Sequence, residues 1–252
     1  MLLMPGSPGI FVGTNNKNQE FICCILIKIT VFLVLINILM EENNNSCLIF
    51  YDFLEPEVNA QLYTHALQQK EAFEHTQTVG KDGQGEINQK WRHSNSLMPK
   101  YFKDYYKLLA KKIKAQVPEI TEKLGLEQFD FGQIEMHLTS HNHGEFYKPH
   151  IDNGAGKLKD RVITFVYYFH SIPREFTGGQ LLFLHNKPKP LIVEPHNNSI
   201  VFFNSSLMHA VHPVNCPSGQ FEHGRFTLNG WIWKKVEEEE VAPVADATDH
   251  NH

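Results

Sequence analysis

This sequence of 252 residues lacks the features that mark several common classes of protein. Its cysteines include no C-x-x-C pair and follow no regular spacing, which argues against a disulfide framework or a zinc site. They are Cys23, Cys24, Cys47 and Cys216. Lys and Arg number 23 against 28 Asp and Glu, without a basic stripe, so no nucleic-acid partner is expected. What remains is an ordinary globular composition, 42% hydrophobic and 20% charged.

The N-terminal part allows two interpretations. Residues 21–40 are nearly continuous Ile, Leu, Val and Phe, long enough to cross a bilayer as a helix, although Lys28 near the middle opposes insertion. The segment before them lacks the charged opening of a standard signal peptide. Either residues 21–40 anchor the protein in a membrane, or translation starts at Met40 and the protein is cytoplasmic, with residues 1–39 an upstream read-through.

Three parts are therefore expected along the chain. The apolar N-terminal segment occupies residues 1–40, and a folded domain occupies residues 47–235. The remaining residues, 236–252, are acidic and lack aromatic side chains, which predicts a disordered tail.

Within the domain, helices come mainly before strands. Helical spacing of apolar residues predicts helices at 56–73, at 99–117 and, more briefly, at 119–124, and residues 79–86 read as an exposed loop. The second helix is expected to present one apolar face, formed by Tyr101, Phe102, Tyr105, Leu108, Leu109 and Ile113. Short apolar runs separated by Gly, Pro and Asn predict an antiparallel β-sandwich or barrel. The runs are 48–51, 133–138, 161–169, 181–184, 191–194, 199–203 and 225–233. Helices should pack outside this β core.

His150 and Asp152, with His209 much later in the chain, are candidate metal ligands. Two imidazoles and one carboxylate form the set that holds non-haem Fe(II) and leaves other positions open. Residues 144–149 read as a loop, and a strand beyond it would project His150 and Asp152 from one side. Side chains alternate between the two faces of a predicted strand after residue 206, so only one of His209 and His212 can face the metal. With 15 histidines in the chain, an incidental surface H-x-D is the competing interpretation.

Arg225 is the other charged residue that needs a partner. It opens a predicted strand rich in large apolar side chains, where an unpaired charge is expensive. A guanidinium binds a carboxylate through two parallel hydrogen bonds. The carboxylate could belong to a dicarboxylic co-substrate or to an Asp or Glu of the chain itself.

Taken in order, these motifs resemble the 2-oxoglutarate- and Fe(II)-dependent dioxygenases, most closely the prolyl 4-hydroxylase-like branch. The motifs are Gly144-x-Phe146-Tyr147-x-Pro149-His150-x-Asp152, Gly178-Gly179-Gln180-Leu181, His209-x-Val211-x-Pro213-Val214, and Arg225 with Trp231. The resemblance implies an α+β, mainly β fold, with a double-stranded β-helix (jelly-roll) core and N-terminal supporting helices.

The resemblance also implies roles for individual residues. Fe(II) would be held by His150, Asp152 and His209. Arg225 would pair with the distal carboxylate of 2-oxoglutarate, assisted by Thr227, and it completes the expected catalytic set with the three ligands. The chain departs from many relatives at His141, where they carry a tyrosine that contacts the co-substrate; an imidazole can also donate a hydrogen bond there.

The implied activity is hydroxylation of an unactivated C–H bond with O2 and 2-oxoglutarate, releasing succinate and CO2, with ascorbate as reductant. A prolyl residue or peptide is the favoured primary substrate, and a free amino acid or small natural product is also compatible. The alternative is a non-enzymatic cupin-like jelly roll that binds a metal or a sugar through residues 141–145. That alternative gives Arg225 and the Gly178-Gly179 pair no purpose.

Overall fold

The computed structural model describes residues 46–79, 85–154, 156–184 and 189–236. The expectations for residues 1–40 and for the tail at 237–252 fall outside these ranges. Among the helices that the structure describes, none combines the length and the apolar character needed to cross a membrane.

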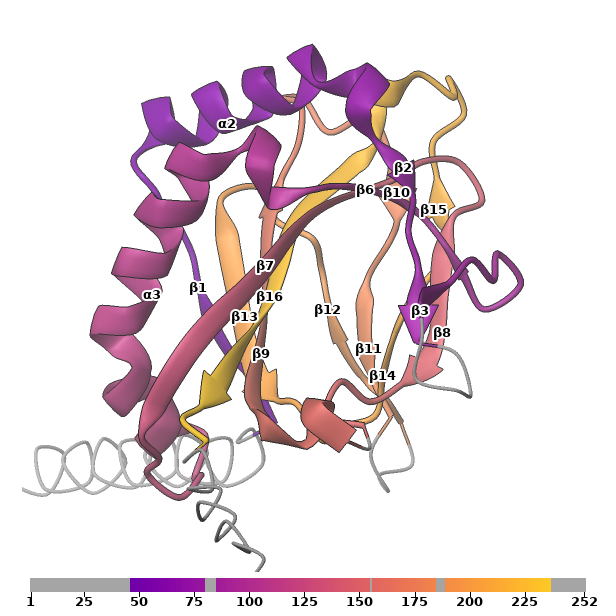
Figure 1. Ribbon diagram of the computed structural model, residues 1–252. Coiled ribbons are helices and arrows are strands. Elements are labelled where there is room, and N and C mark those ends of the chain that lie inside the picture. Colours follow the sequence, from indigo (N-terminus) through magenta and orange to yellow (C-terminus); the bar gives the residue numbers. More distant parts are fainter. Residues whose placement is uncertain (1–45, 80–84, 155, 185–188, 237–252) are drawn as a thin grey trace, which may run out of the picture. The chain divides into compact units, whose positions relative to one another are not determined.

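Two antiparallel sheets form the centre of the molecule (Figure 1). The seven-stranded sheet has the order β1 (Leu48–Phe50), β13 (Ser199–Asn204), β9 (Arg161–Phe169), β16 (Arg225–Lys234), β7 (Phe131–His141), β6 (Asn95–Leu97), β2 (Glu74–His75). The five-stranded sheet has the order β12 (Leu191–Val193), β11 (Leu181–Phe183), β14 (His209–Val211), β8 (Phe146–His150), β5 (Arg92–His93). Two short pairs, β10 (Thr177–Gly178) with β15 (Val214–Asn215) and β3 (Thr78–Val79) with β4 (Gly85–Glu86), complete the strands. This is a jelly-roll arrangement of two opposed sheets.

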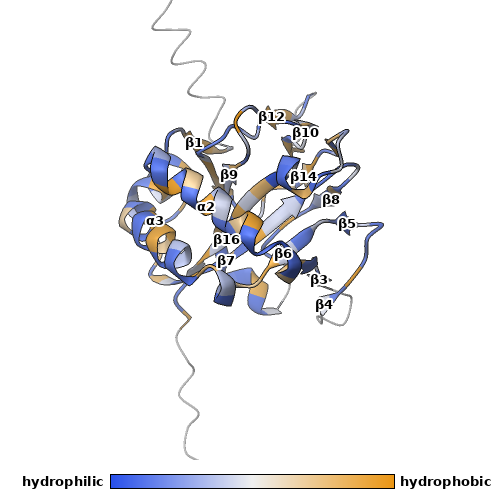
Figure 2. Ribbon diagram, turned by 90° about the horizontal axis from the view of Figure 1, so that it is seen from above, coloured by the Kyte–Doolittle hydropathy of each residue, from blue (hydrophilic) through white to orange (hydrophobic). Residues whose placement is uncertain are grey.

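The helices cover the large sheet on its outer face. Figure 2 shows α2 (Pro56–Gln68) and α3 (Lys103–Lys123) lying together on one side of the strands. Both bury an apolar stripe, including Leu62 of α2 and Ile113 of α3, in a cluster shared with Phe165 and Phe202 of the sheet. A second, smaller cluster fills the space around β9, β11 and β13. The expected α+β, mainly β architecture with supporting helices is confirmed.

The predicted break between two helices near residue 118 is wrong. α3 runs without interruption from Lys103 to Lys123, with Pro118 inside it. Leu109, Ile113, Val117 and Ile120 form one buried stripe that continues past the proline, and this packing outweighs the hydrogen bond that Pro118 cannot donate. The expected apolar face is also too wide, because Leu108 and Tyr101 are exposed. Pro99 opens a separate 3-10 turn, Pro99–Tyr101, and a further turn, Lys70–Ala72, follows α2.

Two predicted loops contain strands. The ends of the loop expected at 79–86 pair as β3 and β4, while residues 80–84 lie outside the described ranges. Residues 146–150, expected to be mostly loop, form β8, which pairs with β14 and β5. The polar sequence Phe146–His150 carries no apolar alternation, and Pro149 argues against a central strand. His150 is therefore the last residue of a strand, and Asp152 lies beyond it.

Candidate functional site

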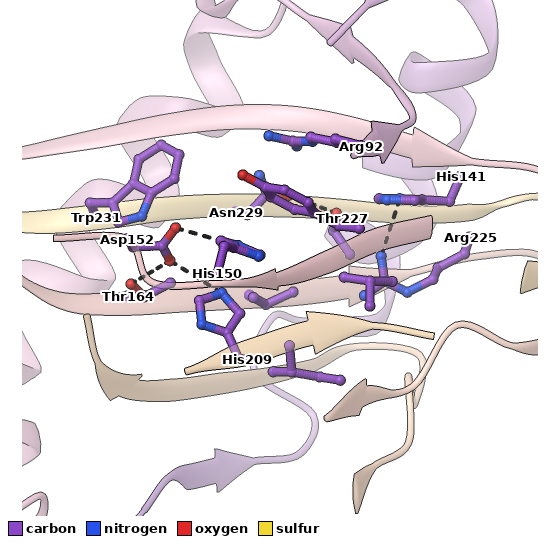
Figure 3. A pocket seen from close by; sticks show the side chains of 14 residues that line it. Arg92, His141, His150, Asp152, Thr164, His209, Arg225, Thr227, Asn229 and Trp231 are labelled. Carbon is purple, nitrogen blue, oxygen red and sulfur yellow. Dashed lines mark hydrogen bonds and ion pairs between the residues drawn. The ribbon is translucent and has the colours of Figure 1, made fainter. Parts of the chain in front are cut away.

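His150, Asp152 and His209 converge in a pocket between the two sheets (Figure 3). One ligand atom from each residue lies within 4.8 Å of the others. The Nε2 atoms of His150 and His209 lie 3.7 Å from Asp152 Oδ1 and 3.4 Å from Asp152 Oδ2, respectively. The two histidines are cross-strand partners on β8 and β14. His212 is exposed, so His209 is the one of the two later histidines that lines this pocket.

Asp152 is positioned beside the histidines by contacts that the sequence did not predict. It is not on the strand of His150, and its backbone N–H donates to the carbonyl of Ser205 over 2.9 Å. Thr164 Oγ1 donates to Asp152 Oδ2 over 2.8 Å and lies 2.9 Å from Ser205 Oγ. The carboxylate is thus positioned by β9 and by the turn after β13, rather than by strand alternation.

The two imidazoles are held in the tautomer that a metal needs. His150 Nδ1 donates to the carbonyl of Lys148 and His209 Nδ1 to that of Leu207, each over 2.8 Å, which leaves both Nε2 atoms as acceptors facing Asp152. Burial, and then the neighbouring His209, lowers the pKa of His150 to about 3, so this ring is neutral at physiological pH. Burial alone would raise the pKa of Asp152, but both histidines and the Thr164 hydroxyl lower it overall. Two imidazole nitrogens and one carboxylate fit ferrous iron.

Arg225 lines the same pocket and is almost completely buried. No carboxylate of the described residues lies within 4.0 Å of its guanidinium, so an internal salt bridge does not compensate it. Its Nη1 lies 3.4 Å from His141 Nδ1, and its Cζ lies 5.0 Å from the centre of the Tyr168 ring. Thr227, two residues along β16, donates to Asn229 Oδ1 over 2.8 Å.

Three buried polar atoms around Arg225 have no hydrogen-bond partner among the described residues: Arg225 Nε, His141 Nε2 and the Tyr168 hydroxyl. Burial, and then the charge of Arg225, holds the pKa of His141 well below its usual value. The neutral ring accepts from Arg225 at Nδ1 and therefore carries its proton on Nε2. Unpaired donors are rare in protein interiors, and their grouping here fits an anionic ligand such as a carboxylate.

The glycine pair at 178–179 makes room for Arg225. Both residues have positive φ, +73° at Gly178 and +69° at Gly179, as expected for a sharp turn. A Cβ at Gly179 would lie only 2.6 Å from Arg225 Cδ. The second glycine is thus required by the arginine as well as by the turn.

Several pocket residues were not predicted from the sequence. Arg92 and Tyr147 lie over the metal site, where the Tyr147 ring stacks on His150 with centroids 3.5 Å apart. Tyr168 does not line the pocket but lies beside Arg225, and it could have been found because a tyrosine in the middle of a buried strand needs a partner for its hydroxyl. Trp231 lines the pocket, as does Asn229.

The cupin-like cluster at 141–145 does not form. Within the described ranges, His150, Asp152 and His209 make up the single metal-competent group. His143 Nδ1 instead accepts from the backbone N–H of Cys216, and Glu145 accepts from the backbone N–H of Asn142. His143 and Glu145, which would have supported a cupin-like site, therefore serve structural contacts.

The chain is similar to known proteins in sequence and in fold. Residues 136–233 match the family model described as the 2OG-Fe(II) oxygenase superfamily. A stretch of 194 residues is 38% identical to an uncharacterised PKHD-type hydroxylase of Synechocystis sp., covering 73% of this chain and 62% of that relative. The chain thus spans less than two thirds of the relative's length. Over residues 136–233 the chain is therefore similar to the 2OG-Fe(II) oxygenase superfamily.

Two solved structures share the fold. A prolyl-4-hydroxylase from Pseudomonas putida superposes with a TM-score of 0.55 at 19% identity, covering 77% of this chain and 95% of that one. A prolyl hydroxylase from Trichoplax adhaerens, solved with a peptide fragment of hypoxia inducible factor, gives a TM-score of 0.56 at 18% identity, covering 76% of this chain and 85% of that one. The resemblance of the fold to the prolyl 4-hydroxylase-like branch is confirmed.

Proposed function

We propose that this protein is an Fe(II)- and 2-oxoglutarate-dependent dioxygenase that hydroxylates an unactivated C–H bond. The observation that carries the proposal is one pocket lined both by the His150–Asp152–His209 group and by the uncompensated Arg225. A metal site alone would suit many proteins, and a buried arginine alone would suit many anions. Together they match a co-substrate that chelates iron at one end and presents a carboxylate at the other.

In this proposal His150, Asp152 and His209 hold the iron. With 2-oxoglutarate bound, ferrous iron supplies the oxygen chemistry that couples formation of succinate and CO2 to hydroxylation. The protein contributes orientation. Thr164 and Ser205 fix the Asp152 carboxylate, and the backbone carbonyls that accept from the two Nδ1 atoms fix the rings.

Arg225 binds the distal carboxylate of 2-oxoglutarate through its fork of N–H groups. His141 lines the same pocket, and its Nε2, which has no partner among the described residues, adds a donor; Thr227 lies on the same strand as Arg225. His141 takes the place of the usual tyrosine as a neutral donor. Because its proton is already on Nε2, it can bind a carboxylate without becoming charged.

For the primary substrate we favour a prolyl residue or a peptide. The support is the prolyl 4-hydroxylase fold and the peptide-bound relative from Trichoplax adhaerens. All pocket residues fall between Arg92 and Trp231, so the catalytic unit is assigned to residues 47–235. Ascorbate is proposed as the reductant that keeps the iron ferrous between turnovers.

The test is an anaerobic titration of the full chain with Fe(II) and 2-oxoglutarate, following the weak visible charge-transfer band of the chelated co-substrate. The expected result is a saturable band in the wild type that is lost in Asp152→Ala. In Arg225→Met the band should return only at higher 2-oxoglutarate concentration. A folded wild-type protein without any band contradicts the proposal.

A further inference from the structure

Arg92 and Arg225 line the same pocket from different sheets (Figure 3). It belongs to β5, the edge strand of the five-stranded sheet, and pairs with Tyr147 of β8. Its guanidinium carbon lies 4.6 Å from the centre of the Tyr147 ring, which in turn stacks on His150. Arg92 is thus separated from a metal ligand by the thickness of one aromatic ring.

The Arg92 side chain is fixed at its Nε end. Nε donates to Ser94 Oγ over 3.0 Å, and Ser94 Oγ donates to Thr76 Oγ1 over the same distance. Ser94 and Thr76 are buried, so this chain of hydrogen bonds is shielded from water. The hydrogen bond to Ser94 uses Nε, and the guanidinium carbon lies against the Tyr147 ring at the wall of the pocket. A guanidinium fixed at Nε presents its remaining N–H groups as a preorganised fork.

The charge of Arg92 is not balanced inside the pocket. Within the described ranges no carboxylate comes within 4.0 Å of it. The permanently charged groups that line the pocket are Arg92, Arg225 and Asp152. Under the proposed function, on which this inference rests, the 2-oxoglutarate dianion balances the ferrous ion, and Asp152 balances Arg225. Arg92, which is half-buried, then remains as one excess positive charge among the pocket residues.

We infer that Arg92 binds a carboxylate of the primary substrate. The substrate is therefore an acid, either a free amino acid or a peptide whose C-terminal carboxylate enters the pocket. A guanidinium and a carboxylate match in a two-pronged geometry, which fixes orientation as well as distance. Because Arg92 lies over Tyr147 and His150, the hydroxylated carbon must be close in the covalent structure to that carboxylate. An interior residue of a long peptide has no carboxylate on its main chain and would leave Arg92 unpaired.

The test uses matched pairs of compounds that differ only in the carboxylate. The first set is the common amino acids, L-proline included, with their carboxamides; the second is short prolyl peptides with free or amidated C-termini. Two quantities are measured with the wild type, Arg92→Met and Arg92→Lys. One is the stimulation of 2-oxoglutarate consumption, and the other is calorimetric binding to the anaerobic Fe(II)–2-oxoglutarate protein. Arg174→Met is the matched control, since Arg174 lies outside the pocket and pairs with Glu194 at 3.6 Å.

We expect at least one acid to bind the wild type and to stimulate it at least 10-fold more strongly than its amide. Arg92→Met should remove this preference, lowering kcat/KM for the acid about 10- to 150-fold, the range of a lost charge-assisted hydrogen bond. Arg92→Lys should retain part of it, and KM for 2-oxoglutarate should stay within about twofold. A response to free amino acids or to peptide acids distinguishes the two sources of the carboxylate.

Three results would overturn the inference. Amides could act as well as acids, or Arg92→Met could raise KM for 2-oxoglutarate and leave the acid preference unchanged. Every acid could also fail to bind a wild type that still binds Fe(II) and 2-oxoglutarate. Failure of the wild type to bind Fe(II) and 2-oxoglutarate is a separate outcome, which contradicts the proposed function itself and removes this inference with it.

Discussion

The Nη1 atom of Arg225 lies 3.4 Å from the Nδ1 atom of His141, and both side chains are almost fully buried. The two residues are direct cross-strand partners on β16 and β7. Each supplies a buried nitrogen without a partner in the described residues. Burial, and then the charge of Arg225, keeps the imidazole neutral, with its proton on Nε2. Under the proposed function, co-substrate binding and the protonation state of His141 are thus linked.

Replacement of Arg225 should affect the co-substrate before it affects the metal. Arg225→Met removes the guanidinium and retains much of the side-chain volume. The affinity for 2-oxoglutarate should fall about 10- to 150-fold, because hydrogen bonds to charged groups contribute about 1.5–3 kcal/mol. Fe(II) binding without 2-oxoglutarate should change little, since Arg225 does not belong to the ligand group. Both affinities can be measured anaerobically, and an unchanged 2-oxoglutarate affinity removes Arg225 from its assigned role.

His141 should make folding sensitive to pH on the acid side. Its folded pKa is held below the ordinary value of 6.5, so the unfolded chain takes up a proton that the folded protein does not accept. The stability that depends on the neutral ring is complete above pH 6.5 and is lost as the pH falls below it. His141→Gln should reduce this loss by up to about 1.4 kcal/mol per pH unit between roughly pH 6 and 5. The loss of stability is measured by urea unfolding of the metal-free protein at several pH values. If stability falls with pH in parallel for the variant and the wild type, the assignment is contradicted.

The two later histidines provide a matched pair for the metal site. His209 is buried against Asp152, whereas His212 is exposed three residues along the chain. His209→Ala should weaken Fe(II) binding at least 10-fold, and His212→Ala should leave it within about twofold of the wild type. Iron content after equilibrium dialysis decides between them. If His212→Ala had the larger effect, the third ligand would have to be reassigned.

Alanine variants at Gly179 and Gly219 can distinguish the effect of backbone strain from the effect of crowding Arg225. Both have φ near +65°, but a Cβ at Gly219 would meet nothing within 4 Å, and one at Gly179 would lie 2.6 Å from Arg225 Cδ. Alanine at either position should cost about 1–2 kcal/mol of unfolding free energy from the left-handed conformation. Only Gly179→Ala should also weaken 2-oxoglutarate binding, by displacing the guanidinium. Equal 2-oxoglutarate affinities in the two variants would show that Arg225 tolerates the added methyl group.

Pro118 should be a site of easy stabilisation. It lies inside α3 on the exposed side, where its ring replaces a backbone hydrogen bond and contributes no buried contact surface. Pro118→Ala should raise the free energy of unfolding by about 1–3 kcal/mol, since proline is the least favourable residue within a helix. Urea denaturation gives the value. A loss of stability would mean that α3 has adapted to the proline and needs it.

The sequence predicts best those elements whose burial is one-sided or complete. β9, β11, β13 and β16 begin and end within one or two residues of the predicted runs, because each is a short apolar segment between turn residues. β8 was missed because its residues are mostly polar and it contains Pro149. Its strand conformation comes from pairing with β14 and β5, which are distant in sequence.

The same contrast holds within the site. His150, Asp152 and His209 were found because their side chains are chemically distinctive and two of them are near neighbours in sequence. Arg92 was not found, since it belongs to a two-residue strand 58 positions before His150 and no local pattern marks it. The positioning of Asp152 was also misassigned, because its hydrogen bonds to Thr164 and Ser205 depend on tertiary contacts.

The two arginines of the pocket differ in how many strands support them. Arg225 lies on β16, which has β7 on one side and β9 on the other, so a change there disturbs the middle of the large sheet. Arg92 lies on β5, at an edge with one neighbour. A substitution at Arg92 therefore disturbs the pairing of one neighbouring strand, whereas one at Arg225 disturbs two. Under the proposed function, the edge of the smaller sheet is thus the place where the choice of substrate can change with the smallest disturbance of the fold.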